Sequence, residues 1–177
     1  MIIRVLALAG GLTGAAAVSQ YPEFSQQYVQ RLAGQVEALG LVVADFDASA
    51  ARSGLTRDAA LGELQGSAFL ADRQADMSRT FARFERLKAD QAMLATATPV
   101  ERIFMPQRLR DGELLAGTWS DFKPAVPLTV AGMVAAGLGF LAGWLGVNLV
   151  AGLLGAVGRR AVPKKAPRPL RVEPTLR

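Results

Sequence analysis

The sequence offers few side chains that could do acid–base or covalent chemistry. Its 177 residues include no cysteine and no histidine. That inventory excludes disulfides, thiolate or imidazole metal sites, cysteine nucleophiles and Ser-His-Asp triads. Carboxylates, lysine, arginine, tyrosine and hydroxyls remain. Paired carboxylates are the strongest candidates among them, because they can act as general acid and base or bind a cation.

The spacing of the carboxylates does not favour such pairs. Asp45 and Asp47 are two residues apart, so on a helix they point to different sides. The charged residues from Asp72 to Asp90 mix signs at spacings of three and four, which is typical of a solvated helix face. No phosphate-binding glycine loop, dinucleotide fingerprint or zinc-ligand spacing occurs in the sequence. We therefore expect no catalytic, cofactor-binding or metal-binding residue, with a membrane-anchored enzyme that uses Asp or Glu as the alternative.

A long apolar segment near the end of the chain predicts a membrane-spanning helix. Residues 124–158 carry no charged side chain, and residues 159–177 carry seven basic groups against one acidic group. A helix needs about 20 apolar residues to cross a bilayer, and basic residues accumulate on its cytoplasmic flank. Pro124 and Pro127 suit the first turn of this helix. We expect the crossing to end near Asn148, with a glycine-interrupted extension in the interface beyond it.

The first apolar segment, residues 1–21, has two interpretations. Its single charge is Arg4, and an apolar run follows. It can be a signal peptide cleaved near Ala15, Ala16 and Ala17, or a retained transmembrane helix that serves as a signal anchor. Both interpretations place residue 22 and those that follow outside the cytoplasm.

Small residues recur at helical spacing in both apolar segments. They are Gly10 and Gly14 in the first, and Ala131, Ala135, Gly139 and Gly143 in the second. Such rows let two helices approach closely in lipid. We expect the two rows to pack against each other, with homo-oligomerisation through the same row as the alternative.

Residues suited to the membrane interface flank both segments. They are Arg4, Tyr21, Trp119, Phe122, Trp144, Arg159 and Arg160. Tyr and Trp favour the headgroup region, and Lys and Arg favour the cytoplasmic side. These positions predict aromatic belts at the two interfaces.

The segment between the apolar regions has helical periodicity throughout. One apolar face comprises Phe24, Tyr28, Leu32, Val36, Leu39, Val43 and Phe46. After a break at Ser53 and Gly54, Thr56 is expected to cap a second helix, whose face comprises Leu61, Leu64, Ala68, Ala71, Met77, Phe81 and Phe84. These two faces predict an antiparallel helical hairpin. A capping box at Thr98–Glu101 predicts a short third helix toward Arg108, and a fourth is expected over residues 111–119.

The predicted fold is all-α, with two transmembrane helices flanking a periplasmic helical hairpin and two further short helices. Its segments are residues 1–21, 22–123, 124–158 and 159–177. The last contains four prolines and is expected to be a disordered basic tail. Basic groups that flank apolar segments favour anionic lipids as the counter-charge and argue against nucleic acid.

Two stretches carry a resemblance to a known family. Residues 21–32, which read YPEFSQQYVQRL, and residues 119–128, which read WSDFKPAVPL, resemble a group of uncharacterised bacterial inner-membrane proteins defined only as a domain of unknown function. The resemblance implies two spans, both termini in the cytoplasm and residues 22–123 in the periplasm. It implies no functional residue.

The sequence favours a small, non-enzymatic integral-membrane protein that acts as an accessory or scaffold for a larger envelope complex. The expected partners are lipid and a membrane protein or a second copy of the chain. A homo-oligomeric pore or transporter module is a further alternative, although the spans offer no intramembrane charge to line a pathway.

Overall fold

The computed structural model describes residues 1–124, 126 and 128–161, and the side chains up to residue 156. Every regular element among these residues is a helix, which confirms the all-α class. In chain order the elements are α1 (Ile2–Val18), α2 (Tyr21–Arg52), α3 (Arg57–Gly62), α4 (Ala68–Thr96), α5 (Pro99–Ile103), the 3₁₀ turn η1 (Pro106–Arg108), α6 (Gly112–Asp121) and α7 (Val130–Ala161). The predicted disordered tail, from residue 162 onward, lies outside the described residues.

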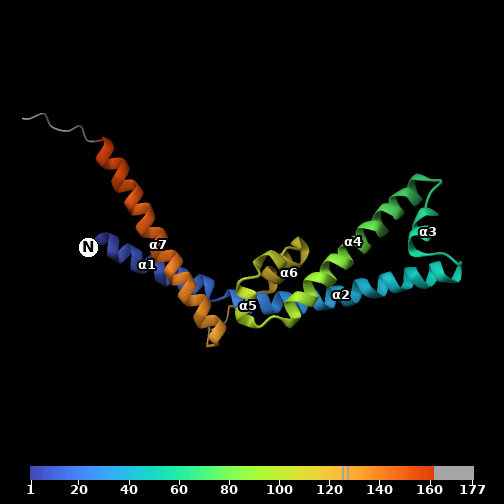
Figure 1. Ribbon diagram of the computed structural model, residues 1–177, viewed down its shortest axis with the longest axis horizontal. Helices are drawn as coiled ribbons and strands as arrows, with labels where there is room; N and C mark the ends of the chain where they lie inside the picture. Colours follow the sequence, from blue (N-terminus) through green and yellow to red (C-terminus); the bar gives the residue numbers. More distant parts are fainter. Residues whose placement is uncertain (125, 127, 162–177) are drawn as a thin grey trace, which may run out of the picture.

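The first apolar helix continues almost without interruption into the first helix of the hairpin (Figure 1). Ser19 and Gln20, between α1 and α2, both keep right-handed helical backbone angles. Pro22 lies in the first turn of α2, where its missing N–H costs little. The direction of α2 is therefore set by the direction of α1.

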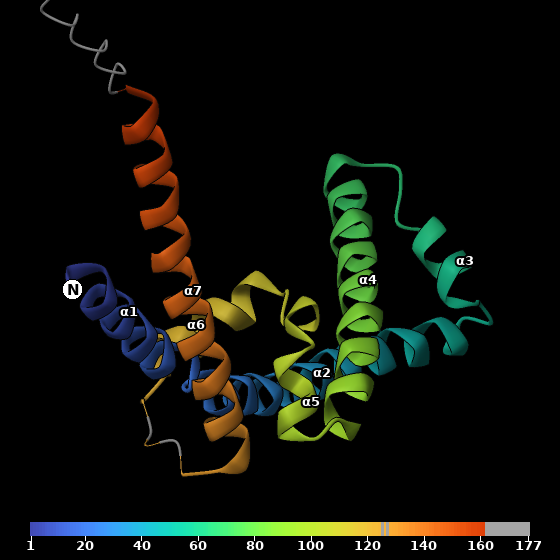
Figure 2. The same cartoon turned by 60° about the vertical axis from the view of Figure 1, so that its left-hand side comes forward.

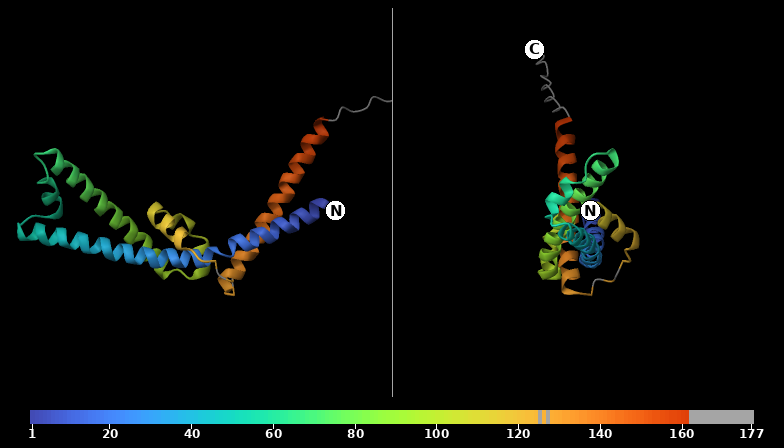
Figure 3. Two further views of the ribbon diagram at one scale, coloured as in Figure 1. Left: turned by 180° about the vertical axis from the view of Figure 1, so that it is seen from behind. Right: turned by 90° about the vertical axis from the view of Figure 1, so that its right-hand side faces the viewer.

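The hairpin is formed by α2 and α4, which run antiparallel and spread apart toward α3 (Figures 1 and 3). Near the base, Tyr28 and Leu32 of α2 pack with Leu87 and Leu94 of α4 in the main hydrophobic core. Leu32 and Leu94 are both fully buried. Burying a leucine side chain contributes about 1.5–3 kcal/mol, so this core is the main attachment between the two helices.

A second core lies farther out along the hairpin. It contains Val43, Met77 and Phe81, with Phe46, Leu61 and Phe84 packed against it. The rings of Phe46 and Phe81 meet edge to face at 5.1 Å between centroids. The apolar face predicted for α2 is therefore the face that packs in the two cores of the hairpin.

The second half of the hairpin differs from the prediction. Thr56 caps only the six-residue helix α3, and α4 starts separately at Ala68, where the Ser67 hydroxyl accepts a hydrogen bond from the Leu70 amide at 3.2 Å. Gly66, in the loop between Gly62 and Ala68, adopts a φ of +97°, which ordinary residues avoid and which lets the chain turn between the two helices. The prediction of one helix from Thr56 to Phe84 was wrong. Ala68 and Ala71 are exposed rather than on the buried face.

Short elements close the base of the hairpin, on the side nearest α1 and α7 (Figure 2). The capping box of α5 is present, with Thr98 and Glu101 each bonding the other's backbone amide. The expected helix toward Arg108 is divided, because α5 ends at Ile103 and η1 begins at Pro106. The expected fourth helix is α6, which Asp111 caps and which ends two residues later than predicted, at Asp121.

The second apolar helix starts later and runs farther than predicted. Pro124 precedes α7, which begins at Val130, and Pro127 lies outside the described residues. The Thr129 hydroxyl accepts a hydrogen bond from the Gly132 amide at 3.1 Å, so a threonine rather than a proline opens the helix. The helix continues unbroken past Asn148, whose amide donates to the Trp144 carbonyl at 2.8 Å. The predicted glycine-interrupted extension is therefore regular helix.

Two helices are long and apolar enough to cross a membrane: the one that starts with α1, and residues Val130–Ala156 of α7. Together they indicate a membrane protein. Their free ends, the N-terminus and the end of α7, both point away from the hairpin (Figures 1 and 3).

Candidate functional site

The glycines of the predicted small-residue rows meet where α1 crosses α7. A Cβ added at Gly14 would collide with the carbonyl oxygen of Gly139, and one at Gly143 would collide with that of Gly10. The backbones of the two helices are therefore in direct contact, which only residues without a side chain allow. Ala131 and Ala135 continue the row on α7 and are buried.

This glycine seam, formed by Gly10, Gly14, Gly139 and Gly143, pairs the two helices within one chain. Beside it, Gly11 lies against the ring of Phe140. Within the chain the seam has the first packing arrangement predicted from the sequence, in which the two rows meet each other.

The predicted interface residues have different environments. Arg4 is exposed near the start of α1, and Trp144 is 42% exposed on α7. Trp119 is 73% exposed and packs with Phe24 and Phe122 in a three-ring aromatic cluster, with centroids 5.6–6.4 Å apart. The side chains of Arg159 and Arg160 lie outside the described residues.

Tyr21 differs from the other predicted interface aromatics. Its hydroxyl donates a hydrogen bond to the Arg102 carbonyl at 3.3 Å, so the phenol joins α2 to α5. Tyr21 therefore supports the base of the hairpin as well as lying at the end of the apolar run.

Sequence analysis missed a buried carboxylate on α4. Asp90 is 1% exposed and accepts hydrogen bonds from Arg108 Nη1 and Arg110 Nε, both at 3.1 Å. Its assignment to a solvated face was wrong. The signal was its spacing of three from Leu87 and four from Leu94, which places it on the buried face.

A second buried carboxylate, Asp111, joins three elements. Arg83 of α4 donates to it at 2.9 and 3.1 Å, and the Leu114 amide of α6 donates at 3.2 Å. The Asp111 amide itself donates to the Tyr28 hydroxyl of α2 at 3.4 Å. Burial opposes ionisation of Asp111, but the hydrogen bonds from Arg83 and Leu114 outweigh it and lower its pKa.

Each of these carboxylates has a basic partner, and a third acid, Asp47, is paired in the same way. Asp47 accepts two hydrogen bonds from Arg57 at 2.5 and 2.7 Å, which hold α3 on α2, and the hydrogen bond from Arg57 lowers the pKa of Asp47. Within the described residues no group of three acidic side chains could hold a metal ion. Asp47, Asp90 and Asp111 therefore connect separate segments of the chain through ion pairs.

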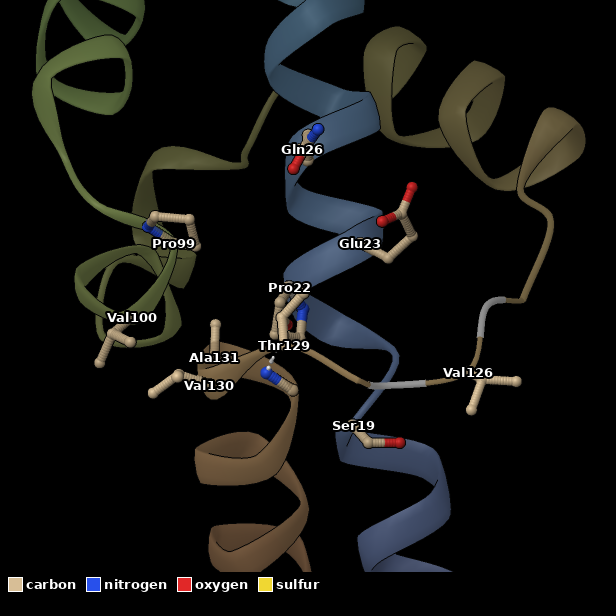
Figure 4. Close-up of a pocket in the computed structure, with 11 residues that line it drawn as sticks. Ser19, Pro22, Glu23, Gln26, Pro99, Val100, Val126, Thr129, Val130 and Ala131 are labelled. Atoms are coloured by element: carbon tan, nitrogen blue, oxygen red, sulfur yellow. Dashed lines mark hydrogen bonds between the residues drawn. The ribbon is translucent and has the colours of Figure 1, made fainter.

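A small hollow lies at the junction of hairpin and spans (Figure 4). Its volume is about 280 Å³. Its lining comes from the end of α1, the first turns of α2, the start of α5 and the first turn of α7. The hydroxyls of Ser19 and Thr129 are bonded to local backbone, and the Glu23 carboxylate, which also lines the hollow, accepts a hydrogen bond from Gln27 at 3.1 Å.

The fold defines an all-helical membrane protein with two apolar helices that contact through glycines and a helical hairpin between them in the sequence. The chain belongs to the DUF2937 family of proteins of unknown function, whose sequence profile matches residues 2–160. The resemblance found in the sequence is thereby confirmed. No curated protein and no solved structure matches the chain.

Proposed function

We propose that this protein is a non-enzymatic membrane accessory protein that presents its hairpin as a docking element for a larger envelope complex. In this proposal the chain lies in the bacterial inner membrane. Both termini are cytoplasmic, the hairpin is periplasmic and the basic tail lies against anionic lipids. The observation that supports it most is the direct passage of α1 into α2, combined with the glycine seam.

That combination gives the hairpin a defined direction relative to the spans. A hairpin on a flexible linker could serve as a tether, whereas α1 and α2 are joined by only two residues with helical backbone angles, which transmits orientation. The buried ion pairs at Asp90 and Asp111 fix the base of the hairpin in the same way. Defined geometry is what docking to a constant partner requires, because preorganisation reduces the entropy lost on binding.

Affinity isolation of the full-length protein from membranes in mild detergent tests the proposal. We expect one constant membrane-protein partner in a fixed ratio to the bait. The variant Gly14→Leu, which forces α1 away from α7, should lose most of that partner. The control is Gly137→Leu, because a side chain at Gly137 enters open space, and it should retain the partner.

Two results would contradict the proposal. One is a bait that yields no constant partner, even after cross-linking in intact membranes. The other is an equal yield of partner with Gly14→Leu and Gly137→Leu, since docking would then not depend on the direction set by the seam.

A further inference from the structure

An apolar hollow of about 690 Å³ lies beside the point where α1 passes into α2. Its lining comes from the last turn of α1, the first turn of α2 and the end of α6, and includes Ala17, Tyr21, Phe24, Trp119 and Phe122. None of the described residues that line it carries a charge. Such a lining suits an apolar ligand.

The polar groups of the lining have partners within the chain. The Tyr21 hydroxyl donates a hydrogen bond to the Arg102 carbonyl, and the Gln20 amide donates one to the Ser19 hydroxyl, both at 3.3 Å. These bonds direct both groups to the chain itself. The aromatic rings are therefore the main surface that a ligand meets.

Three of these rings form a fixed wall of the hollow. Phe24 meets Trp119 and Phe122 edge to face, at 6.1 and 5.6 Å between centroids, and Trp119 stacks on Phe122 at 6.4 Å. Contacts of this kind hold the rings in place. Trp119 nevertheless remains 73% exposed. An indole held in that state is unfavourable in water and favourable at the depth of lipid head groups.

The exposed side of α1 leads directly to the hollow. Leu6, Thr13 and Ala17 are exposed and follow one another at spacings of seven and four, so they share one side of the helix. Phe24 comes seven residues after Ala17, along a path that stays helical between α1 and α2, and is therefore in line with them. In a bilayer, the lipid that covers this side of α1 reaches the hollow.

We propose that this hollow holds the upper part of an acyl chain from a phospholipid of the leaflet on the hairpin side. Trp119 then lies at the depth of the head groups, and the end of α6 is anchored to the membrane surface. The sequence predicted Trp119 and Phe122 as separate interface residues, whereas the hollow gives them one lipid chain to bind. This inference rests on α1 and α7 crossing a bilayer and requires no protein partner.

The position of Ala17 favours lipid over a second protein as the occupant. Ala17 belongs to the helix that is apolar enough to cross a membrane, and it lines the hollow as well. A protein that filled the hollow would have to displace the lipid already in contact with this helix.

Fluorescence of Trp119 in vesicles tests the proposal. The chain has two tryptophans, so Trp144→Phe leaves Trp119 as the only one. The full-length variant is reconstituted in vesicles of phosphatidylcholine whose acyl chains carry bromine either near the head group or near the chain end. We expect bromine near the head group to quench Trp119 at least about twofold more strongly, because tryptophan favours that depth.

Phe69 provides the matched control. It is 75% exposed, like Trp119, but lies at the start of α4, at the end of the hairpin far from α1 (Figure 1). Phe69→Trp, in a chain that also carries Trp119→Phe and Trp144→Phe, should be quenched by acrylamide in the water and by neither brominated lipid.

A second pair of variants tests the hollow itself, in the chain that carries Trp144→Phe. Ala17→Phe fills the hollow with a ring and should lower the lipid quenching of Trp119 by about twofold, because lipid loses one face of the indole. Ala16→Phe is its control, since Ala16 is also exposed on α1 but does not line the hollow. It should leave the quenching unchanged.

Three results would overturn the proposal. Quenching of Trp119 by acrylamide but by neither lipid would place the rings in water. Protection of Trp119 from both kinds of quencher would show that a protein surface covers it. Equal lipid quenching in Ala17→Phe and Ala16→Phe would show that lipid does not enter the hollow. The docking proposal is tested separately, by the isolation of a protein partner.

Discussion

At the residue scale, the buried carboxylates show how similar charge patterns can have different roles. Asp76 and Asp90 belong to the same mixed-sign run on α4. Asp76 pairs with Arg79 on the surface, whereas Asp90 is buried with Arg108 and Arg110. Sequence periodicity relative to the leucines could have separated them. The identity of the arginine partners could not be predicted, because they lie on a different element, 18 and 20 residues away.

Replacing Asp90 by Asn should lower the free energy of unfolding by about 1–3 kcal/mol. The substitution leaves two arginines without their charged acceptor, and the estimate is reduced because both remain partly solvated. Chemical denaturation in detergent, followed by circular dichroism, measures the change. The control, Asp76→Asn, breaks an exposed pair and should stay within about 0.5 kcal/mol. Equal effects of the two substitutions would show that burial of Asp90 is unimportant.

Asp111 should make stability depend on pH in the acid range. Its pKa in the folded protein is below the ordinary value of 3.8, so the stability it contributes is present above that value and is lost as pH falls toward the folded pKa. Asp111→Asn keeps a side chain able to cap α6 but removes the charge. Thermal unfolding between pH 6 and pH 3 should show a wild-type advantage over this variant that shrinks as pH falls. A constant difference across the range would contradict the ion pair with Arg83.

At the element scale, the helices follow from local signals and the breaks between them depend on glycine. The capping residues Thr56 and Thr98 lie where the sequence placed them. Asp111 was predicted as the first residue of the fourth helix, and it is the residue that caps α6. The apolar periodicity of α2 also identified its packed face. The same periodicity was misleading across Gly62 and Gly66, since apolar residues on both sides fit one helical pattern although the chain turns between them.

Gly66→Ala should destabilise the turn between α3 and α4. A φ of +97° is strained for any residue with a Cβ, so we expect a loss of about 1 kcal/mol or more. Gly62 is the matched control because it is helical and a Cβ there meets open space. Gly62→Ala should raise stability by up to about 1 kcal/mol. Denaturant unfolding of the two variants measures the contrast, and a destabilising Gly62→Ala with a neutral Gly66→Ala would refute this account of the break.

The start of α7 illustrates another limit of sequence reasoning. Proline is common in the first turn of a helix, so Pro124 and Pro127 were expected inside it. The helix instead begins at Val130 after a threonine cap. Proline is equally compatible with the extended segment that precedes a helix, and tertiary packing against α2 and α5 decides between the two.

At the scale of the whole molecule, the apolar segments and the hairpin were predictable because each depends on composition or short-range periodicity. The meeting of Gly10 and Gly14 with Gly143 and Gly139 could be proposed, since each row is visible alone. The small hollow at the junction of hairpin and spans could not, because its lining combines α1, α2, α5 and α7. Such sites depend on which distant residues the fold brings together.

The molecule has two parts, the paired apolar helices and the hairpin, and α1 and α2 join them. The glycine seam holds the two apolar helices, and α1 passes directly into α2 and the hairpin. The docking proposal requires that the hairpin and the chain ends lie on opposite sides of a membrane.

Labelling of single cysteines tests this topology most directly, because the natural chain has none. Ala75→Cys places a thiol on an exposed position of α4, and Leu176→Cys places one near the C-terminus. In intact spheroplasts, a membrane-impermeant maleimide should label the cysteine at position 75 and should label that at 176 only after lysis. Equal labelling of both before lysis, or protection of position 75 until lysis, would contradict the account.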